Sequence, residues 1–166
     1  MEGIIKMKIK KICRYLLISS LIAVLCGCSY ANNRNFTFSI ENGDAIKVSI
    51  DTKDGYGLSQ KGGSFIVSKD DNTISQGVFL ADNVYNQYKK LIVENTNNDV
   101  ENVEKGTYND NDYIYYETEG KSGREYNYIV KVKYTNTGVL IGSTVSKDEA
   151  QNAFKKLKIY DEIHAV

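Results

Sequence analysis

The sequence predicts an α+β fold, a mostly antiparallel sheet with two packed helices. Most segments alternate apolar and polar residues with the period of a β-strand and are separated by short turns, which favours hairpins. Only two segments, residues 83–93 and the residues after Ser146, carry apolar residues at helical spacing. Two helices cannot cover every strand of such a chain, so we expect both to pack on one sheet.

The first predicted hairpin joins strands at 35–41 and 45–51. Both strands alternate apolar and polar residues. Asn42-Gly43 lies between them, and both of these residue types tolerate the positive φ angles of a type I′ turn. We therefore expect a tight two-residue connection here.

A second hairpin is predicted further along the chain. Strands at 64–68 and 73–80 flank the polar residues 69–72. The glycine-containing segments 54–57 and 62–63 are expected to be turns or loops.

The first helix is predicted over residues 83–93. Asp82 is a suitable cap at its start, and the asparagine-rich residues 95–99 end it. An apolar stripe with the spacing i, i+4, i+7 and i+8 is expected to face the sheet, and it comprises Val84, Tyr88, Leu91 and Ile92.

The second half of the chain predicts four more strands, the second helix and a short final strand. The four strands are expected over 100–106, 112–119, 126–134 and 139–145. Ser146 and Glu149 have the spacing of a capping box at the start of a helix. The apolar face of that helix comprises Ala150, Ala153, Phe154 and Leu157. Ile159 and Tyr160 predict the final strand.

This order of elements resembles the PsbP-like α/β/α sandwich, a fold shared by a photosystem subunit and a nuclear Ran-binding factor. The similarity covers roughly residues 36–160. It lies in the N-terminal hairpin with Phe36 and Phe38, the helix after Gly77-Val78-Phe79, and the final helix followed by a short strand. The resemblance implies binding and assembly roles rather than one shared reaction, and it transfers no site residues.

The N-terminal residues have the three parts of a secretory signal peptide. Residues 1–14 carry five basic residues against one acidic residue, and residues 15–25 are apolar and uncharged. The following residues, Leu25-Cys26-Gly27-Cys28, resemble the lipobox of bacterial lipoproteins. In that family the cysteine thiol receives a diacylglyceryl group and the signal peptide is cut just before it, here between Gly27 and Cys28.

The lipobox implies lipidation of Cys28, with palmitate-type acyl chains holding the protein on the extracytoplasmic face of a bacterial cell membrane. Two acyl chains suffice for stable anchoring. Many Asn, Lys and Ile residues and the absence of Pro and Trp indicate an AT-rich, Gram-positive source. Met7 is an alternative start that leaves the cut unchanged. We expect a signal peptide over 1–27, a lipidated tether over 28–34, a single α+β domain over 35–161 and a tail over 162–166.

Charge and cysteine content exclude several classes of partner. Five of 21 basic and one of 21 acidic residues leave with the signal peptide, so the mature chain keeps 16 basic and 20 acidic residues and a formal charge of −4. A nucleic-acid partner, which requires a concentrated basic face, is not expected. The one remaining cysteine, Cys28, would carry lipid, which leaves no disulfide and no thiolate metal site.

The residue types of common catalytic, metal and cofactor sites are scarce in this sequence. His164 is the single histidine, and it falls in the predicted tail, where partners are not held in fixed geometry. The acidic segments 70–72 and 110–112 lack the spacing of a calcium loop, so solvated turns are favoured over cation sites. A carboxylate pair for glycoside hydrolysis is the remaining enzymatic alternative, disfavoured by the absence of Trp, and its candidates are Glu117, Glu119 and Glu125.

Tyrosines crowd two adjacent predicted strands. Alternation places Tyr113 and Tyr115 on one face and Ile114 on the other. If Ile114 marks the core side, the outward candidate interaction face comprises Tyr113, Tyr115, Tyr126 and Tyr128, a residue type that suits protein interfaces. The alternative, which we favour, is cross-strand pairing under a covering helix.

These observations predict a membrane-anchored, non-enzymatic binding or assembly module. Its partner would be a protein or another envelope component, bound through the sheet edge or the tyrosine face. An immunity or inhibitor lipoprotein against an envelope-targeted toxin is the alternative, because that role also needs no chemistry. A hydrolase is a third and less favoured class, since it requires ionisable groups with shifted pKa values in a cleft.

Overall fold

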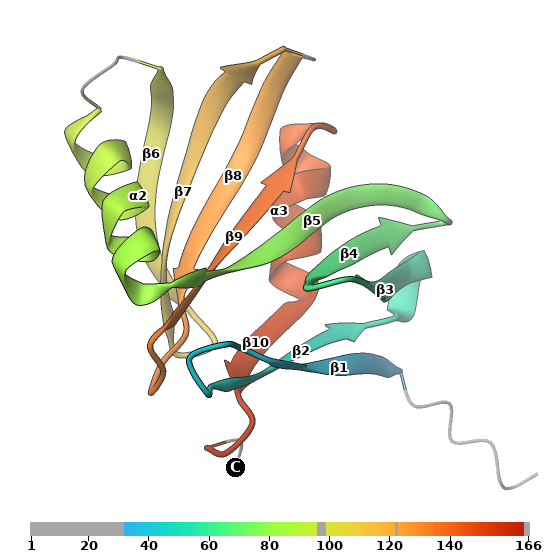
Figure 1. The fold of residues 1–166 in the computed structure, drawn as a ribbon. Coiled ribbons are helices and arrows are strands. Elements are labelled where there is room, and N and C mark those ends of the chain that lie inside the picture. Colours follow the sequence, from blue (N-terminus) through green and yellow to red (C-terminus); the bar gives the residue numbers. More distant parts are fainter. Residues whose placement is uncertain (1–31, 96–98, 122, 165–166) are drawn as a thin grey trace, which may run out of the picture. The chain divides into compact units, whose positions relative to one another are not determined.

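The protein folds into an α+β domain with ten strands and two α-helices in the part of the chain that the structure describes (Figure 1). The structure is a computed structural model that describes residues 32–95, 99–121 and 123–164. Every strand pairing within these ranges is antiparallel. The predicted class, a mostly antiparallel sheet with two packed helices, is confirmed. The predicted cleavage and lipidation residues Gly27 and Cys28 lie outside the described residues.

The strands form two sheets. The smaller sheet has the order β1-β2-β10 and consists of β1 (Asn33–Ser39), β2 (Ala45–Asp51) and β10 (Leu157–Asp161). The larger sheet has the order β3-β4-β5-β9-β8-β7-β6 and consists of β3 (Tyr56–Lys61), β4 (Ser64–Lys69), β5 (Asn72–Ala81), β6 (Val100–Tyr108), β7 (Asn111–Gly120), β8 (Gly123–Lys131) and β9 (Thr137–Ser143). The helical segments are η1 (Lys53–Gly55), α2 (Asp82–Glu94) and α3 (Lys147–Lys156).

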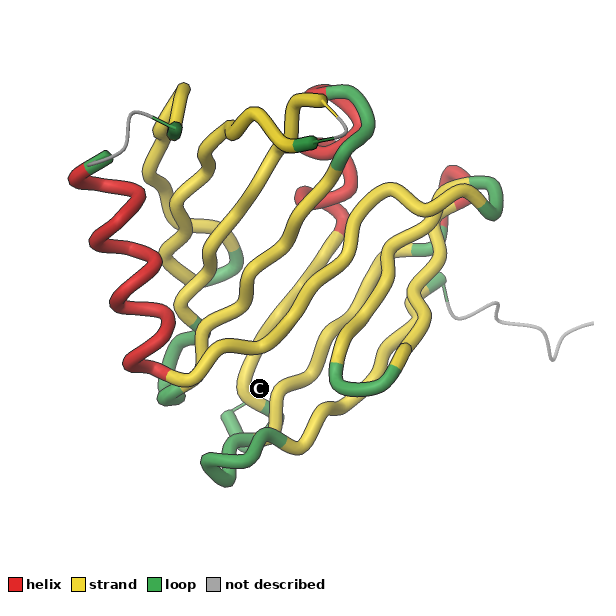
Figure 2. The backbone as a smooth tube through the Cα atoms, turned by 45° about the horizontal axis from the view of Figure 1, so that its top comes forward, coloured by secondary structure: helices red, strands yellow, loops and turns green. Residues whose placement is uncertain are grey.

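The larger sheet is covered on both faces. α2 packs on one face, here called the outer face, while α3 and the smaller sheet pack on the opposite, inner face (Figures 1 and 2). The main core fills the space on the inner face, and its members include Phe38, Ile46, Val48, Phe65, Val67 and Phe154. A second, smaller core lies beneath α2 and comprises Tyr85, Ile92, Ile114, Tyr116 and Ile129.

The first hairpin forms where predicted, but its turn differs from the predicted type I′. Gly43 has a φ of +92°, whereas Asn42 is not among the residues with positive φ. The amide of Gly43 donates to the carbonyl of Ile40 (2.9 Å), and the amide of Ile40 donates to the carbonyl of Asp44 (2.9 Å). This pattern is a type I turn followed by a left-handed glycine, the three-residue hairpin connection. Two-residue turns with positive φ at both positions occur instead at Asp70-Asp71 and Asn109-Asp110.

The predicted apolar stripe of α2 is partly wrong. The helix buries Tyr85 and Ile92, whereas Leu91 is 55 % exposed and Tyr88 is also exposed. The ring of Tyr85 lies against Gly138 of β9, where a Cβ would come within 2.6 Å of it, so the absence of a side chain lets this turn of the helix approach the sheet. The predicted cap is also wrong, because Asp82 belongs to the helix and Ala81 is the N-cap without a side-chain cap.

One strand was not predicted. β3 begins at Tyr56, inside the expected loop 54–57, includes Gly57 and pairs with β4 along its whole length. α3 forms after Ser146 as predicted, except that Leu157, which was assigned to the apolar face of the helix, is the first residue of β10. At the start of α3, the hydroxyl of Ser146 accepts a hydrogen bond from the amide of Glu149 (3.3 Å), as the capping motif requires. The final strand pairs with β2, which links the last helix to the first hairpin.

Candidate functional site

The predicted tyrosine face lies inside the protein rather than on its surface. Tyr115 is 1 % exposed and Tyr128 is 5 % exposed, while Tyr113 and Tyr126 are partly buried against the same core. The expectation that Tyr113 and Tyr115 point outward was therefore wrong. Its premise was that only one face of the strand is buried, whereas α3 covers the tyrosines and α2 covers Ile114.

The tyrosines pack across the strands and beneath α3. Tyr115 lies opposite Tyr128 in the register of β7 and β8, with ring centroids 5.1 Å apart. The ring of Tyr128 stacks on Phe154 of α3 at 3.9 Å, and Tyr113 meets Phe154 edge-on at 5.2 Å. Each aromatic pair contributes about 0.5–1.5 kcal/mol beyond the burial of its surface. The alternative of cross-strand pairing under a helix is confirmed for these residues.

A cavity of about 280 Å³, here called the tyrosine cavity, opens between these rings, β6 and α3. Its lining comprises Glu104, Thr107, Tyr108, Tyr113, Tyr115, Tyr128, Gln151, Phe154 and Lys155. Within the described chain, the hydroxyls of Tyr113 and Tyr128 form no hydrogen bond, and neither Glu104 nor Lys155 forms an ion pair. The cavity thus holds several polar groups without protein partners.

Beside this cavity a buried carboxylate, Glu117 of β7, collects hydrogen bonds from several elements. It is 3 % exposed. Its Oε1 accepts from the hydroxyl of Tyr115 (2.7 Å) and from Nζ of Lys147 in the first turn of α3 (3.0 Å). Its Oε2 accepts from the guanidinium of Arg124 on β8 (3.1 Å), which also pairs with Glu101 on β6 (3.0 Å). We call these five residues the Glu117 network.

The network keeps Glu117 ionised. Burial alone raises the pKa of its carboxyl, but hydrogen bonds from Tyr115, Lys147, Asn102 and Arg124 outweigh burial and lower the pKa to about 2. Burial and the hydrogen bond to Glu117 raise the pKa of the Tyr115 phenol well above its ordinary value. At neutral pH the ionised carboxylate is a weak base and the phenol is a weak acid, so neither pKa lies near neutrality, where general acid–base catalysis is most efficient.

Of the three carboxylates considered for glycoside hydrolysis, two lie on one face of the sheet and the third lies on the other. Glu117 and Glu119 share one face of β7 and both contact Arg124. Glu125 is opposite Thr118 in the register, so strand alternation places it on the other face of the sheet. That face carries a second hollow, of about 400 Å³.

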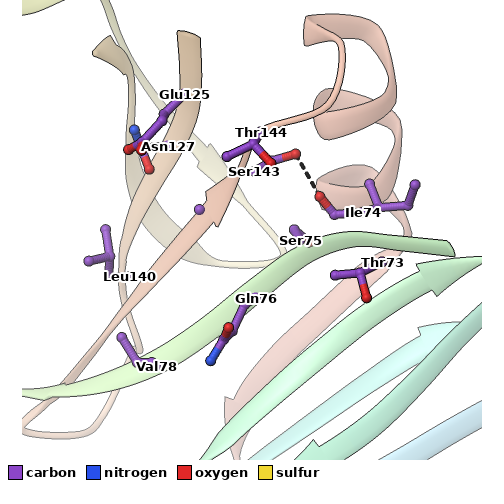
Figure 3. Close-up of a pocket in the computed structure, with 11 residues that line it drawn as sticks. Thr73, Ile74, Ser75, Gln76, Val78, Glu125, Asn127, Leu140, Ser143 and Thr144 are labelled. Carbon is purple, nitrogen blue, oxygen red and sulfur yellow. Dashed lines mark hydrogen bonds between the residues drawn. The ribbon is translucent and has the colours of Figure 1, made fainter. Parts of the chain in front are cut away.

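The second hollow lies on the outer face where β5 separates from β9 (Figure 3). The two strands pair from Gln76 onward, and the hydroxyl of Ser143 donates to the carbonyl of Ile74 across the gap (2.6 Å). The amides that line this hollow already have protein partners. Gln76 donates to Ser64 (3.3 Å), and Asn127 donates to Thr118 (3.2 Å). Two other groups of its lining, the buried hydroxyl of Ser75 and the carboxylate of Glu125, have no partner among the described residues. We regard the tyrosine cavity as the better candidate for a ligand site because its lining carries unpaired groups of both charges, Glu104 and Lys155.

The structure places the other predicted groups as follows. His164 is about half exposed, and its Nδ1 contacts the carboxylate of Asp161. The acidic segments 70–72 and 110–112 lie at hairpin turns. Among the residues placed by the structure, no cluster of three or more His, Cys, Asp or Glu side chains could hold a metal ion. No helix in the same ranges is long and apolar enough to cross a membrane.

Sequence reasoning missed Glu104, Lys155 and Lys147, which converge only through tertiary structure. Lys147 is 30 residues from Glu117, and the bulge of β6 between Glu101 and Glu104 has no signal in the residue pattern.

In comparisons with known proteins, the chain matches no family model and no curated protein. Its own sequence and geometry therefore carry the functional proposal.

Proposed function

We propose that this chain is a bacterial lipoprotein whose domain acts as a non-enzymatic binding or assembly module on the extracytoplasmic face of the cell membrane. The membrane would be reached through a diacylglyceryl group on Cys28. In this proposal residues 1–27 are the signal peptide, and a short tether precedes β1.

The binding role is supported chiefly by the tyrosine cavity. It offers hydroxyl, carboxylate and ammonium groups that have no partner in the described chain. The adjacent carboxylate, Glu117, is ionised at neutral pH, which suits a structural or binding role better than proton transfer. A concave site with a few convergent polar groups is the usual form of a ligand site.

We further propose that the domain belongs to the PsbP-like folds. Three features support this assignment: an N-terminal hairpin, a helix directly after β5, and a final helix followed at once by a short strand. The larger sheet also lies between α2 and α3, which gives an α/β/α layering. Folds of this kind serve binding and assembly, in agreement with the proposed role.

The anchoring is tested by the variant Cys28→Ala in cells grown with radiolabelled palmitate. We expect the label to be lost and the uncleaved precursor to accumulate. The matched control is Cys26→Ala, which removes a cysteine two residues earlier and should leave labelling and cleavage unchanged. Labelled, normally processed Cys28→Ala protein would contradict the proposal.

A further inference from the structure

The tyrosine cavity offers polar groups rather than aromatic faces. One face of the Tyr128 ring is occupied by Phe154, and Lys147 lies over the Tyr115 ring at 5.2 Å. Stacking on a sugar or a quaternary ammonium group needs a free aromatic face. What the cavity presents instead are the hydroxyls of Tyr113 and Tyr128 and two opposite charges.

The residues that carry those two charges, Glu104 and Lys155, lie toward opposite ends of the cavity. Glu104 stands opposite Tyr115 near the start of α3, where its negative charge also acts on Lys147. Lys155 lies in the last turn of α3, and its carbonyl accepts a hydrogen bond from Tyr108 at the far end of β6. Glu104 and Tyr108 are four positions apart on β6, which corresponds to about 13 Å between their Cα atoms.

A peptide could also pair with the open edge of the sheet, but β6 is poorly suited to this. It is the edge strand, and its register is broken by a bulge between Glu101 and Glu104. Bulges and charged side chains are the features that protect sheet edges from further pairing. The interior of the cavity is therefore favoured over the edge.

We propose that the tyrosine cavity binds a small zwitterion, a peptide of two or three residues with free termini. The ammonium terminus lies at Glu104 and the carboxylate terminus lies at Lys155. The peptide groups between them bond to the hydroxyls of Tyr113 and Tyr128. An extended chain spans about 3.3–3.6 Å per residue, so two or three residues, together with the reach of the Glu104 and Lys155 side chains, match the length of β6 from Glu104 to Tyr108. This inference rests on the proposed function, because it assumes that the domain is a binding module.

The test uses the full chain in detergent micelles and isothermal titration calorimetry with trialanine. We expect saturable binding that weakens about tenfold or more when the peptide is N-acetylated or when its carboxylate is amidated, because each change removes one charge-assisted contact. Glu104→Gln and Lys155→Met should each weaken binding of free trialanine by a similar factor. The matched controls Glu94→Gln on α2 and Lys158→Met on β10 lie outside the cavity and should bind as the wild type does.

A second variant alters the cavity without removing either charge. A Cβ at Gly106 would lie 2.7 Å from the hydroxyl oxygen of Tyr113, so Gly106→Ala must displace that ring. We expect weaker trialanine binding by Gly106→Ala, with a urea midpoint that shows the protein is still folded. Equal binding of free and blocked peptides, or no binding of free trialanine, would overturn the proposed ligand. The palmitate labelling of Cys28 is measured independently, so failure here is distinguishable from failure of the proposed anchoring.

Discussion

The substitution Glu117→Gln should destabilise the domain, and the effect should depend on pH. A fall in the carboxyl pKa from 4.5 to about 2 corresponds to about 3 kcal/mol of stabilisation of the ionised form. Arg124 and Lys147 are each partly exposed, so solvent screening reduces this value, and Gln can keep some of the hydrogen bonds. We therefore expect a loss of about 1.5–3 kcal/mol in the free energy of unfolding at pH 7.

The pH dependence follows from the direction of the shift. Because the folded-state pKa is depressed, the contribution of Glu117 is fully present above the unfolded-state value of 4.5. It is lost as the pH falls toward 2, where the wild-type side chain becomes protonated in the folded protein as well. The difference between wild type and Glu117→Gln should accordingly shrink between pH 5 and pH 2.

Urea unfolding followed by far-UV circular dichroism at several pH values measures this difference. The matched control is Glu119→Gln, which removes a carboxylate that contacts the same Arg124 but is 70 % exposed. That pair should contribute at most about 0.5 kcal/mol. The reasoning fails if the two variants lose equal stability at pH 7, or if the loss in Glu117→Gln is the same at pH 7 and pH 2.5.

Two further substitutions test the packing and a turn. Gly77→Ala should lower the free energy of unfolding by about 1–3 kcal/mol, because a Cβ there would lie 2.0 Å from the buried ring of Phe65. The control is Gly63→Ala, where a Cβ would have no atom within 4 Å. Equal melting temperatures of the two variants would contradict this prediction. Asp71→Gly should raise the free energy of unfolding in urea by about 0.5 kcal/mol, because Asp71 has a φ of 65° in a two-residue hairpin turn. Asp71→Ala should lower this free energy, and the opposite order of the two variants would refute the role of backbone strain.

The strand pattern was predictable because alternation is a local property, but the choice of buried face was not. Alternation alone correctly separates Tyr113 and Tyr115 from Ile114. It cannot tell which side is covered when a helix packs on each side, and here both sides are covered. The same limit applies to α2, where the helical period was correct and Leu91 was nevertheless assigned to the wrong face.

Gly and Asn residues correctly indicated where the first turn lies, but they did not indicate its backbone conformation. Asn42-Gly43 marked the first turn, yet only Gly43 takes a positive φ, because the connection has three residues rather than two. The same emphasis on glycine concealed β3, whose residues Tyr56 and Leu58 are buried between two glycine-containing turns. A short strand that contains one glycine, Gly57, and is flanked by others resembles a loop when only local composition is considered.

The Glu117 network and the tyrosine cavity have a common origin in the way α3 is attached to the sheet. A helix of ten residues is marginal by itself, so tertiary contacts must hold it. Lys147 fixes its first turn to Glu117, and Phe154 fixes its last turns to Tyr128. Gln151, midway between these attachments, lines the cavity. If the attachments define the cavity, loosening the first turn by Glu117→Gln should weaken trialanine binding even though Glu117 does not line the site. Unchanged affinity in a destabilised Glu117→Gln protein would show instead that the Phe154 attachment alone maintains the cavity.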